Sequence, residues 1–162
     1  MRVGTDPEGV VQIGSRVYVA NFLSHSISVV DPVAGIVVGT IPLTLTHTPA
    51  PDPSGVAANG DGTHLYVDDS RNGLTDVIDL SHTPPAQEGS AAVGTFPAYL
   101  VINGTTGYVA NATSGAGAGT VSVVDDSDPR APRGHAHGDR RIASLRRGAP
   151  AVAGRGPGGQ LR

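Results

Sequence analysis

The sequence predicts an all-β protein made of a repeated block of strands. Three landmarks recur in the same order: a proline that opens the block, a tyrosine inside it and an aspartate that closes it. Successive copies of each landmark are separated by 42–48 residues. The three sets are Pro7, Pro53 and Pro97, then Tyr18, Tyr66 and Tyr108, then Asp31, Asp79 and Asp125. Strand-rich repeats of about 40–50 residues are typical of propeller blades.

Composition supports short strands joined by turns. Gly and Pro account for 36 of the 162 residues, and paired β-branched residues such as Val29-Val30 and Val123-Val124 favour pleated strands over helices. No window shows apolar residues sustained at helical spacing, so little helix is expected. The chain has no Cys, which excludes disulfides and thiolate metal sites.

The first repeat predicts four strands, over 10–13, 16–21, 26–31 and 36–41, separated by breakers such as Gly14-Ser15. Four antiparallel strands in about forty residues make one propeller blade.

The later repeats are less regular. In the second, strands are expected over 55–58, 64–68 and 75–80, with only a short outer piece near 91–93, because Pro84-Pro85 interrupts the segment before it. In the third, strands are expected over 98–102, 106–110 and 120–125, and no fourth strand is expected after Asp125.

The predicted fold is therefore an all-β, β-propeller fragment of about three four-stranded antiparallel blades. It is expected to be open rather than closed, because closed propellers need about 4–8 blades. Predicted boundaries are 3–42 for blade 1, 43–92 for blade 2, 93–128 for an incomplete blade 3 and 129–162 for a disordered tail rich in Arg, Gly and Pro.

Charge separates the body from the tail. Residues 1–129 carry thirteen acids and three Arg, whereas residues 130–162 carry eight Arg and one acid. The tail has no aromatic side chain to stack on bases, so no specific nucleic-acid binding is expected. No run of residues approaches the ~18 apolar residues of a membrane span.

The repeat resembles the YVTN-type β-propeller repeat over residues 3–128. The first copy carries P-x-G-V at Pro7, then YVAN at Tyr18, and later a closing Asp31 and T-I-P at Thr40. The resemblance implies a bacterial or archaeal protein, commonly exported or on the cell surface, and usually with more blades. We therefore expect this chain to be a fragment of a larger propeller protein.

Nine residues are singled out by the repeat, and all are expected to serve structure rather than chemistry. The tyrosines are predicted to pack between blades, and the Asn and Asp residues to bind turn backbone at strand ends. They are Tyr18, Asn21, Asp31, Tyr66, Asp69, Asp79, Tyr108, Asn111 and Asp125.

No catalytic residue, cofactor or metal site is expected. Neighbouring acids at Asp68-Asp69 and Asp125-Asp126 offer oxygen ligands for a hard cation, but ordinary turns use the same residues. His135 and His137 are expected to have only adventitious metal affinity. No G-x-S-x-G, H-E-x-x-H or phosphate loop occurs.

The predicted function is a non-enzymatic repeat module for protein or ligand binding. The alternative is part of a propeller enzyme, since some propellers that resemble this repeat are lactonases or carry redox cofactors. Blades at the ends of an open array expose apolar faces and strand edges. The expected partner is accordingly another protein, or a second copy whose blades complete the propeller.

Overall fold

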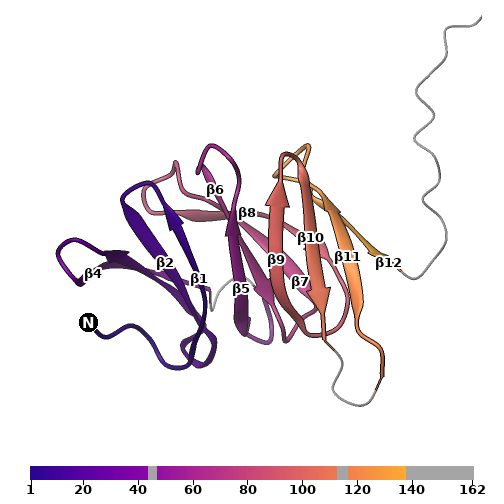
Figure 1. Ribbon diagram of the computed structural model, residues 1–162, viewed down its shortest axis with the longest axis horizontal. Coiled ribbons are helices and arrows are strands. Elements are labelled where there is room, and N and C mark those ends of the chain that lie inside the picture. Colours follow the sequence, from indigo (N-terminus) through magenta and orange to yellow (C-terminus); the bar gives the residue numbers. More distant parts are fainter. Residues whose placement is uncertain (44–46, 113–116, 138–162) are drawn as a thin grey trace, which may run out of the picture.

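The computed structural model describes residues 1–43, 47–112 and 117–137, which form three separate four-stranded antiparallel sheets (Figure 1). The predicted open array of three blades is confirmed. Blade 1 contains β1 (Pro7–Ile13), β2 (Arg16–Asn21), the 3₁₀ turn η1 (Phe22–Ser24), β3 (Ser26–Asp31) and β4 (Ile36–Pro42). Blade 2 contains β5 (Pro53–Ala58), β6 (His64–Asp69), β7 (Leu74–Asp79) and β8 (Ala86–Ala92), and blade 3 contains β9 (Pro97–Asn103), β10 (Thr106–Asn111), β11 (Thr120–Asp125) and β12 (Arg133–His137).

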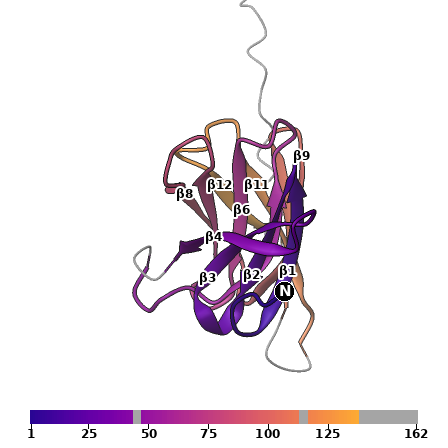
Figure 2. The same cartoon turned by 90° about the vertical axis from the view of Figure 1, so that its left-hand side faces the viewer.

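The first strands of the three blades lie side by side, with β5 between β1 and β9 (Figure 1). Figure 2, with blade 1 toward the viewer, shows the three sheets one behind another. Glycine makes this close approach possible. A Cβ added to Gly9 would lie 2.2 Å from the Ser54 carbonyl oxygen, and one added to Gly55 would lie 2.8 Å from the Ala98 carbonyl oxygen.

Two apolar layers hold the blades together. The larger layer lies between blades 1 and 2 and includes Ala20, Ile27, Leu65 and Ile78, each at most 1% exposed. The smaller layer, between blades 2 and 3, centres on Ala91, Val109 and Val124. The alternation of the strands produces this arrangement, because every second residue faces the same neighbouring blade.

The outer strands correct two expectations. β8 begins at Ala86 and is longer than the short piece expected near 91–93, because Pro84-Pro85 precedes the strand and does not interrupt it. The expectation that no fourth strand follows Asp125 is wrong: β12 pairs with β11 from Asp125↔Arg133 to Val121↔His137. Blade 3 therefore continues past 128, and the remainder of the predicted disordered tail, 138–162, lies outside the described residues.

Backbone pairing explains why a strand with few apolar residues forms β12. Every second residue of an antiparallel edge strand exchanges backbone hydrogen bonds with the neighbouring strand, without burying a large side chain. Gly134 lets β12 approach β8, since a Cβ there would lie 1.7 Å from the Ala92 carbonyl oxygen. Within the described ranges, no helix is long and apolar enough to cross a membrane.

Candidate functional site

The three repeat tyrosines occupy equivalent places in the second strand of each blade. Tyr18 packs against the apolar layer between blades 1 and 2. Tyr66 is completely buried, and its hydroxyl donates to the Asp126 carboxylate of blade 3. Tyr108 lies on the outer side of blade 3 and is 44% exposed. Among the residues that the structure describes, only the first two tyrosines have a neighbouring blade packed over them.

The closing aspartates bind the backbone of the turns that follow them. Asp31 accepts from the N–H groups of Val33 and Ala34 at 3.0 Å each. Asp79 accepts from Ser81 N–H at 2.7 Å, and Asp125 accepts from Ser127 N–H at 3.0 Å. These bonds lower the pKa of Asp31, with the Ala34 N–H as the main cause.

The residue that ends the second strand begins a polar network inside blades 1 and 3. In blade 1, Asn21 is fully buried and donates to Ser26 and Ser28, while its side-chain oxygen accepts from Gly4 N–H.

Blade 3 repeats this network. The Asn111 side chain donates to Thr120 and Ser122 and accepts from Gly94 N–H. Both networks are neutral, and each buried amide is satisfied.

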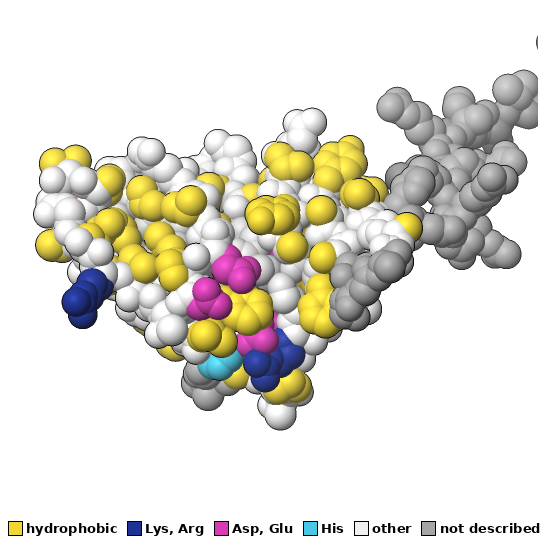
Figure 3. Space-filling model, turned by 60° about the horizontal axis from the view of Figure 1, so that its bottom comes forward, with side chains coloured by type: hydrophobic (Ala, Val, Ile, Leu, Met, Phe, Trp, Pro, Cys, Tyr) yellow, Lys and Arg dark blue, Asp and Glu magenta, His cyan; other side chains and the backbone are white. Residues whose placement is uncertain are grey.

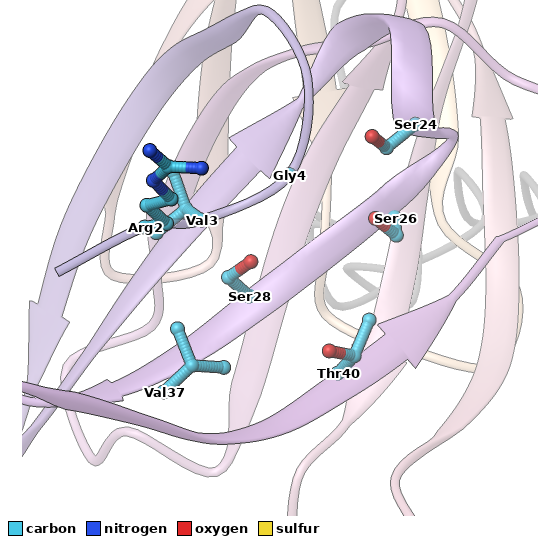
Figure 4. Close-up of a pocket in the computed structure, with 8 residues that line it drawn as sticks. All are labelled: Arg2, Val3, Gly4, Ser24, Ser26, Ser28, Val37 and Thr40. Atoms are coloured by element: carbon cyan, nitrogen blue, oxygen red, sulfur yellow. The ribbon is translucent and has the colours of Figure 1, made fainter.

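In blade 1 this position borders a shallow hollow of about 290 Å³ (Figure 4). Hydroxyl side chains from β3 and β4 face the N-terminal segment across it. The residues around it are Arg2, Val3, Gly4, Ser24, Ser26, Ser28, Val37 and Thr40.

Blade 2 places a different chemistry at the same position. The strand registers put Asp69 where blade 1 has Asn21, and Asp76 where it has Ser28. His47, from the link between blades 1 and 2, reaches Asp76 with its Nε2 2.7 Å from Oδ1. One potential ligand atom from each of the three residues lies within 4.8 Å of the others.

The polar residues of β8 also contact Asp76. Ser90 Oγ donates to Asp76 Oδ1 at 2.6 Å, and Gln87 Nε2 donates to the same oxygen at 3.0 Å. Asp76 is 0% exposed, and burial raises the pKa of its carboxyl while the hydrogen bond from His47 lowers it. The other oxygen, Oδ2, is buried and has no hydrogen-bond partner among the described residues.

A second His–carboxylate cluster lies at the opposite end of β6. His64 Nε2 is 2.9 Å from Glu88 Oε2, and Arg130 Nε is 2.8 Å from Glu88 Oε1. Asp79, the third member, accepts from His82. Basic side chains already contact both carboxylates of this cluster, and Arg130 supplies a positive charge to Glu88.

Asp68 faces blade 3 from the residue next to Asp69. Its Oδ1 accepts from Thr75 Oγ1 at 2.7 Å, whereas its buried Oδ2 has no partner among the described residues. Burial raises the pKa of Asp68 to about 7. The corresponding residues in blades 1 and 3 are Ala20 and Ala110, so this acid too is peculiar to blade 2.

Charged side chains gather on the face formed by the blade-to-blade links (Figure 3). Arg71 binds Asp52 through two of its nitrogens, and His25 Nδ1 lies 3.3 Å from the same carboxylate. Burial, with the charges of Asp6 and Asp52, raises the pKa of Glu8 nearby.

A hollow of about 260 Å³ adjoins the first strands, between Glu8, Ser54, Ala98 and Tyr99. The Ser54 hydroxyl donates to the Pro97 carbonyl oxygen at 2.8 Å, so it is not paired with a base. The residues lining this hollow therefore offer no nucleophile activated by a base.

An apolar face is exposed on the outer side of blade 3. Four of its side chains, here called the blade-3 face, are 44–76% exposed. They are Tyr99, Val101, Tyr108 and Val121.

The fold does not bring the nine repeat residues together in one site. Of the nine, Asp69 alone joins the His47 cluster, and Asp79 joins the His64 cluster. The other aspartates bind turn backbone, the asparagines belong to polar networks, Tyr18 and Tyr66 pack between blades, and Tyr108 is exposed. His47 and Asp76 were missed, although comparing the repeats reveals a signal, because Asp replaces Asn and Ser at equivalent positions.

No family model and no curated protein matches this chain, but solved structures do. Hydrazine synthase of Kuenenia stuttgartiensis is 25% identical with a TM-score of 0.65, and the match covers 86% of this chain and 39% of that one. A putative 6-phosphogluconolactonase of Bacteroides uniformis is 17% identical, with a TM-score of 0.60 and coverage of 78% and 40%. The β-propeller domain of Cps50 (Swd1) from Myceliophteria thermophila is 11% identical, with a TM-score of 0.62 and coverage of 84% and 40%.

These similarities and the three radiating sheets define an array of β-propeller blades. The chain spans about two fifths of the length of the solved chains it matches.

Proposed function

We propose that this chain is a non-enzymatic binding module of the YVTN repeat type, and that its blade-3 face docks another β-propeller blade. That blade belongs to a second copy of this chain. The carrying observation is that the blade-3 face is exposed, whereas the equivalent side chains of blades 1 and 2 are buried or half-buried against a neighbouring blade.

The repeat allows the comparison residue by residue. Tyr108 is 44% exposed, but its counterpart Tyr66 is 0% exposed, and Val121 is 47% exposed where its counterparts Ile27 and Thr75 are 0% and 1% exposed. Burying such side chains contributes roughly 1.5–3 kcal/mol each. Exposed apolar patches with aromatic residues are typical of interaction surfaces.

Tyr99 determines how such a blade docks. It stands at the position of Gly9 and Gly55, where an added Cβ meets the carbonyl oxygen of the next blade. A blade docked on β9 must therefore lie further from it than β5 lies from β1. The tyrosine ring then fills the intervening space, as an aromatic anchor does in an interface.

Sedimentation velocity of the full chain over a range of concentrations tests the proposal. We expect reversible association, and we expect the double variant Tyr108→Ser/Val121→Ser to weaken it at least tenfold. Loss of two desolvated apolar contacts, at more than 1.4 kcal/mol in total, accounts for that factor.

The matched control is Val33→Ser, because Val33 is 96% exposed in a turn away from the blade-3 face. This variant should associate like the unmodified chain. A monodisperse monomer that melts cooperatively at every concentration would overturn the proposal, as would equal weakening by the control.

A further inference from the structure

The three blades provide an internal comparison for the His47 cluster. Blades 1 and 3 keep a neutral Asn–Ser pair at this position, and a glycine N–H donates to the Asn. Blade 2 changes both members to Asp and brings in His47. Packing needs neither acid, because the neutral pair fills the same place in the other two blades.

The free oxygen of Asp76 indicates what the cluster lacks. Its Oδ1 already receives three hydrogen bonds, from His47, Gln87 and Ser90. Its Oδ2 is buried and receives none from the described residues. A buried carboxylate oxygen without a partner costs free energy unless a donor or a cation meets it.

Asp69 contributes a second carboxylate beside it. Asp69 Oδ1 accepts from the backbone N–H groups of Asp52, Arg71 and Asn72. Its Oδ2 accepts only from the Asn72 side chain, so a lone pair remains on that oxygen. His47 is the one basic side chain that contacts Asp76 among the described residues, and two carboxylates carry more negative charge than it can balance.

We propose that His47, Asp69 and Asp76 bind a divalent transition-metal ion, of the Zn²⁺ or Mn²⁺ class, between the link and blade 2. The ligands are one oxygen of each carboxylate and His47 Nε2, which gives up its proton and its hydrogen bond to Asp76 Oδ1 when the ion binds. Ser90 and Gln87 orient Asp76 through the oxygen that does not bind the ion, as outer hydrogen bonds do in metal sites.

The donor set selects the class of ion. One imidazole with two carboxylates suits Zn²⁺ and Mn²⁺, whereas Ca²⁺ and Mg²⁺ prefer oxygen alone. Ligands at 2.0–2.2 Å from an ion lie at most about 4.4 Å apart. A ring nitrogen of His47 and one oxygen of each aspartate lie within 4.8 Å of one another, which is close to the spacing that a shared ion requires. His47 is 20% exposed in its side chain and gives the ion a route from solvent.

Isothermal titration of the chelator-treated full chain with ZnCl₂, MnCl₂ and CaCl₂ tests the proposal. All proteins carry His135→Ala/His137→Ala, which removes the His-Ala-His sequence of the C-terminal part. We expect one equivalent of Zn²⁺ or Mn²⁺ to bind at least tenfold more tightly than Ca²⁺. Saturation with the tighter ion should raise the Tm by about 4 °C or more.

The decisive variant is Asp69→Asn/Asp76→Ser, which installs the residues that blades 1 and 3 carry and should therefore fold. We expect it to lose at least a hundredfold in affinity. His47→Gln should abolish the preference over Ca²⁺. The visible spectrum of bound Co²⁺ gives a second readout, because it should change on removal of the nitrogen ligand.

His64→Gln, in the second cluster, is the matched control and should bind the ion as before. The proposal is overturned if no ion binds, if the Asp69→Asn/Asp76→Ser protein binds equally well, or if His64→Gln removes the binding. Binding of Ca²⁺ as tight as that of Zn²⁺ and Mn²⁺ would also contradict it. Absence of binding would leave His47 and Asp76 as a structural ion pair and would not affect the proposed docking face.

Discussion

In blade 1 the buried amide of Asn21 donates to Ser28, whereas in blade 2 the carboxylates of Asp69 and Asp76 stand at those two positions beside His47. Both arrangements sit on equivalent strands of their blades, β2–β3 and β6–β7, in the same register. The neutral Asn21–Ser28 pair forms its hydrogen bond within the blade and needs no charge from outside it. The acidic pair needs positive charge from outside the sheet, supplied in part by the link. Equivalent positions in a repeat thus share a backbone while their chemistry differs.

The largest effect is expected from moving the acidic pair into blade 1 without its histidine. In Asn21→Asp/Ser28→Asp, two buried carboxylates would lie side by side, with Gly4 in place of a cation. We expect a loss of roughly 3–5 kcal/mol in the free energy of unfolding at pH 8, since unpaired buried charges are costly.

Chemical denaturation at pH 8 and pH 4 measures this effect. The penalty should shrink at pH 4, because protonation neutralises carboxyls whose pKa is raised by burial. A double variant as stable as the unmodified chain at pH 8 would show that blade 1 tolerates the pair, and the distinction between the blades would fail.

A smaller effect is expected from Asp68, the other acid peculiar to blade 2. Its pKa is raised to about 7 in the folded chain from about 3.9 when unfolded. The folded state therefore binds the proton more tightly, and the associated stability is present at low pH and is lost as pH rises through 7. Between pH 5 and pH 9 the unmodified chain should lose roughly 2–3 kcal/mol more than Asp68→Ala.

Denaturant titrations of both proteins at five pH values between 5 and 9 give this difference directly. Ala is the residue of the other two blades here, so the variant makes blade 2 resemble them. Parallel stability curves for the two proteins would mean that Asp68 is already ionised when folded at pH 5.

The smallest effect is expected where the blades agree, at the closing aspartate. Arg16→Gln removes the ion pair between Arg16 Nη1 and Asp31 Oδ2, which are 2.8 Å apart in side chains that are 40% and 24% exposed. Because water and salt screen exposed pairs, thermal melts in 0.15 M salt should agree within experimental scatter. A clear drop in Tm would show that the turn depends on this pair and that the backbone bonds to Asp31 are not sufficient.

Much of the fold could be predicted from the sequence, because most of the strands carry their own signal. The paired valines and flanking turn residues place β3 and β11, and the recurring proline places β1, β5 and β9. β12 carries no such signal, since its stability comes from pairing with β11 and from the close passage of Gly134 past Ala92. A prediction based on side-chain pattern alone misses a strand of this kind.

The candidate site was harder to predict because its members come from different kinds of segment. His47 belongs to an irregular proline-rich link and lies 29 residues before Asp76. The link meets β7 only in the folded chain, where His47 contacts Asp76 and Leu43 is completely buried. Asp69 and Asp76 differ from the residues at the same positions of the other repeats, which the sequence alone shows. That difference does not identify His47 as the side chain that contacts Asp76.

The glycine position on the first strand has a consequence for how such an array can grow by gene duplication. If a copy of blade 2 were inserted after blade 1, its first strand would pack against Gly9, which has no Cβ to prevent close approach. The same copy inserted after blade 3 would meet the Cβ and ring of Tyr99. The blades are therefore not interchangeable. The residue at this position of each first strand determines how closely the next blade can pack, and so restricts the order in which blades can be added.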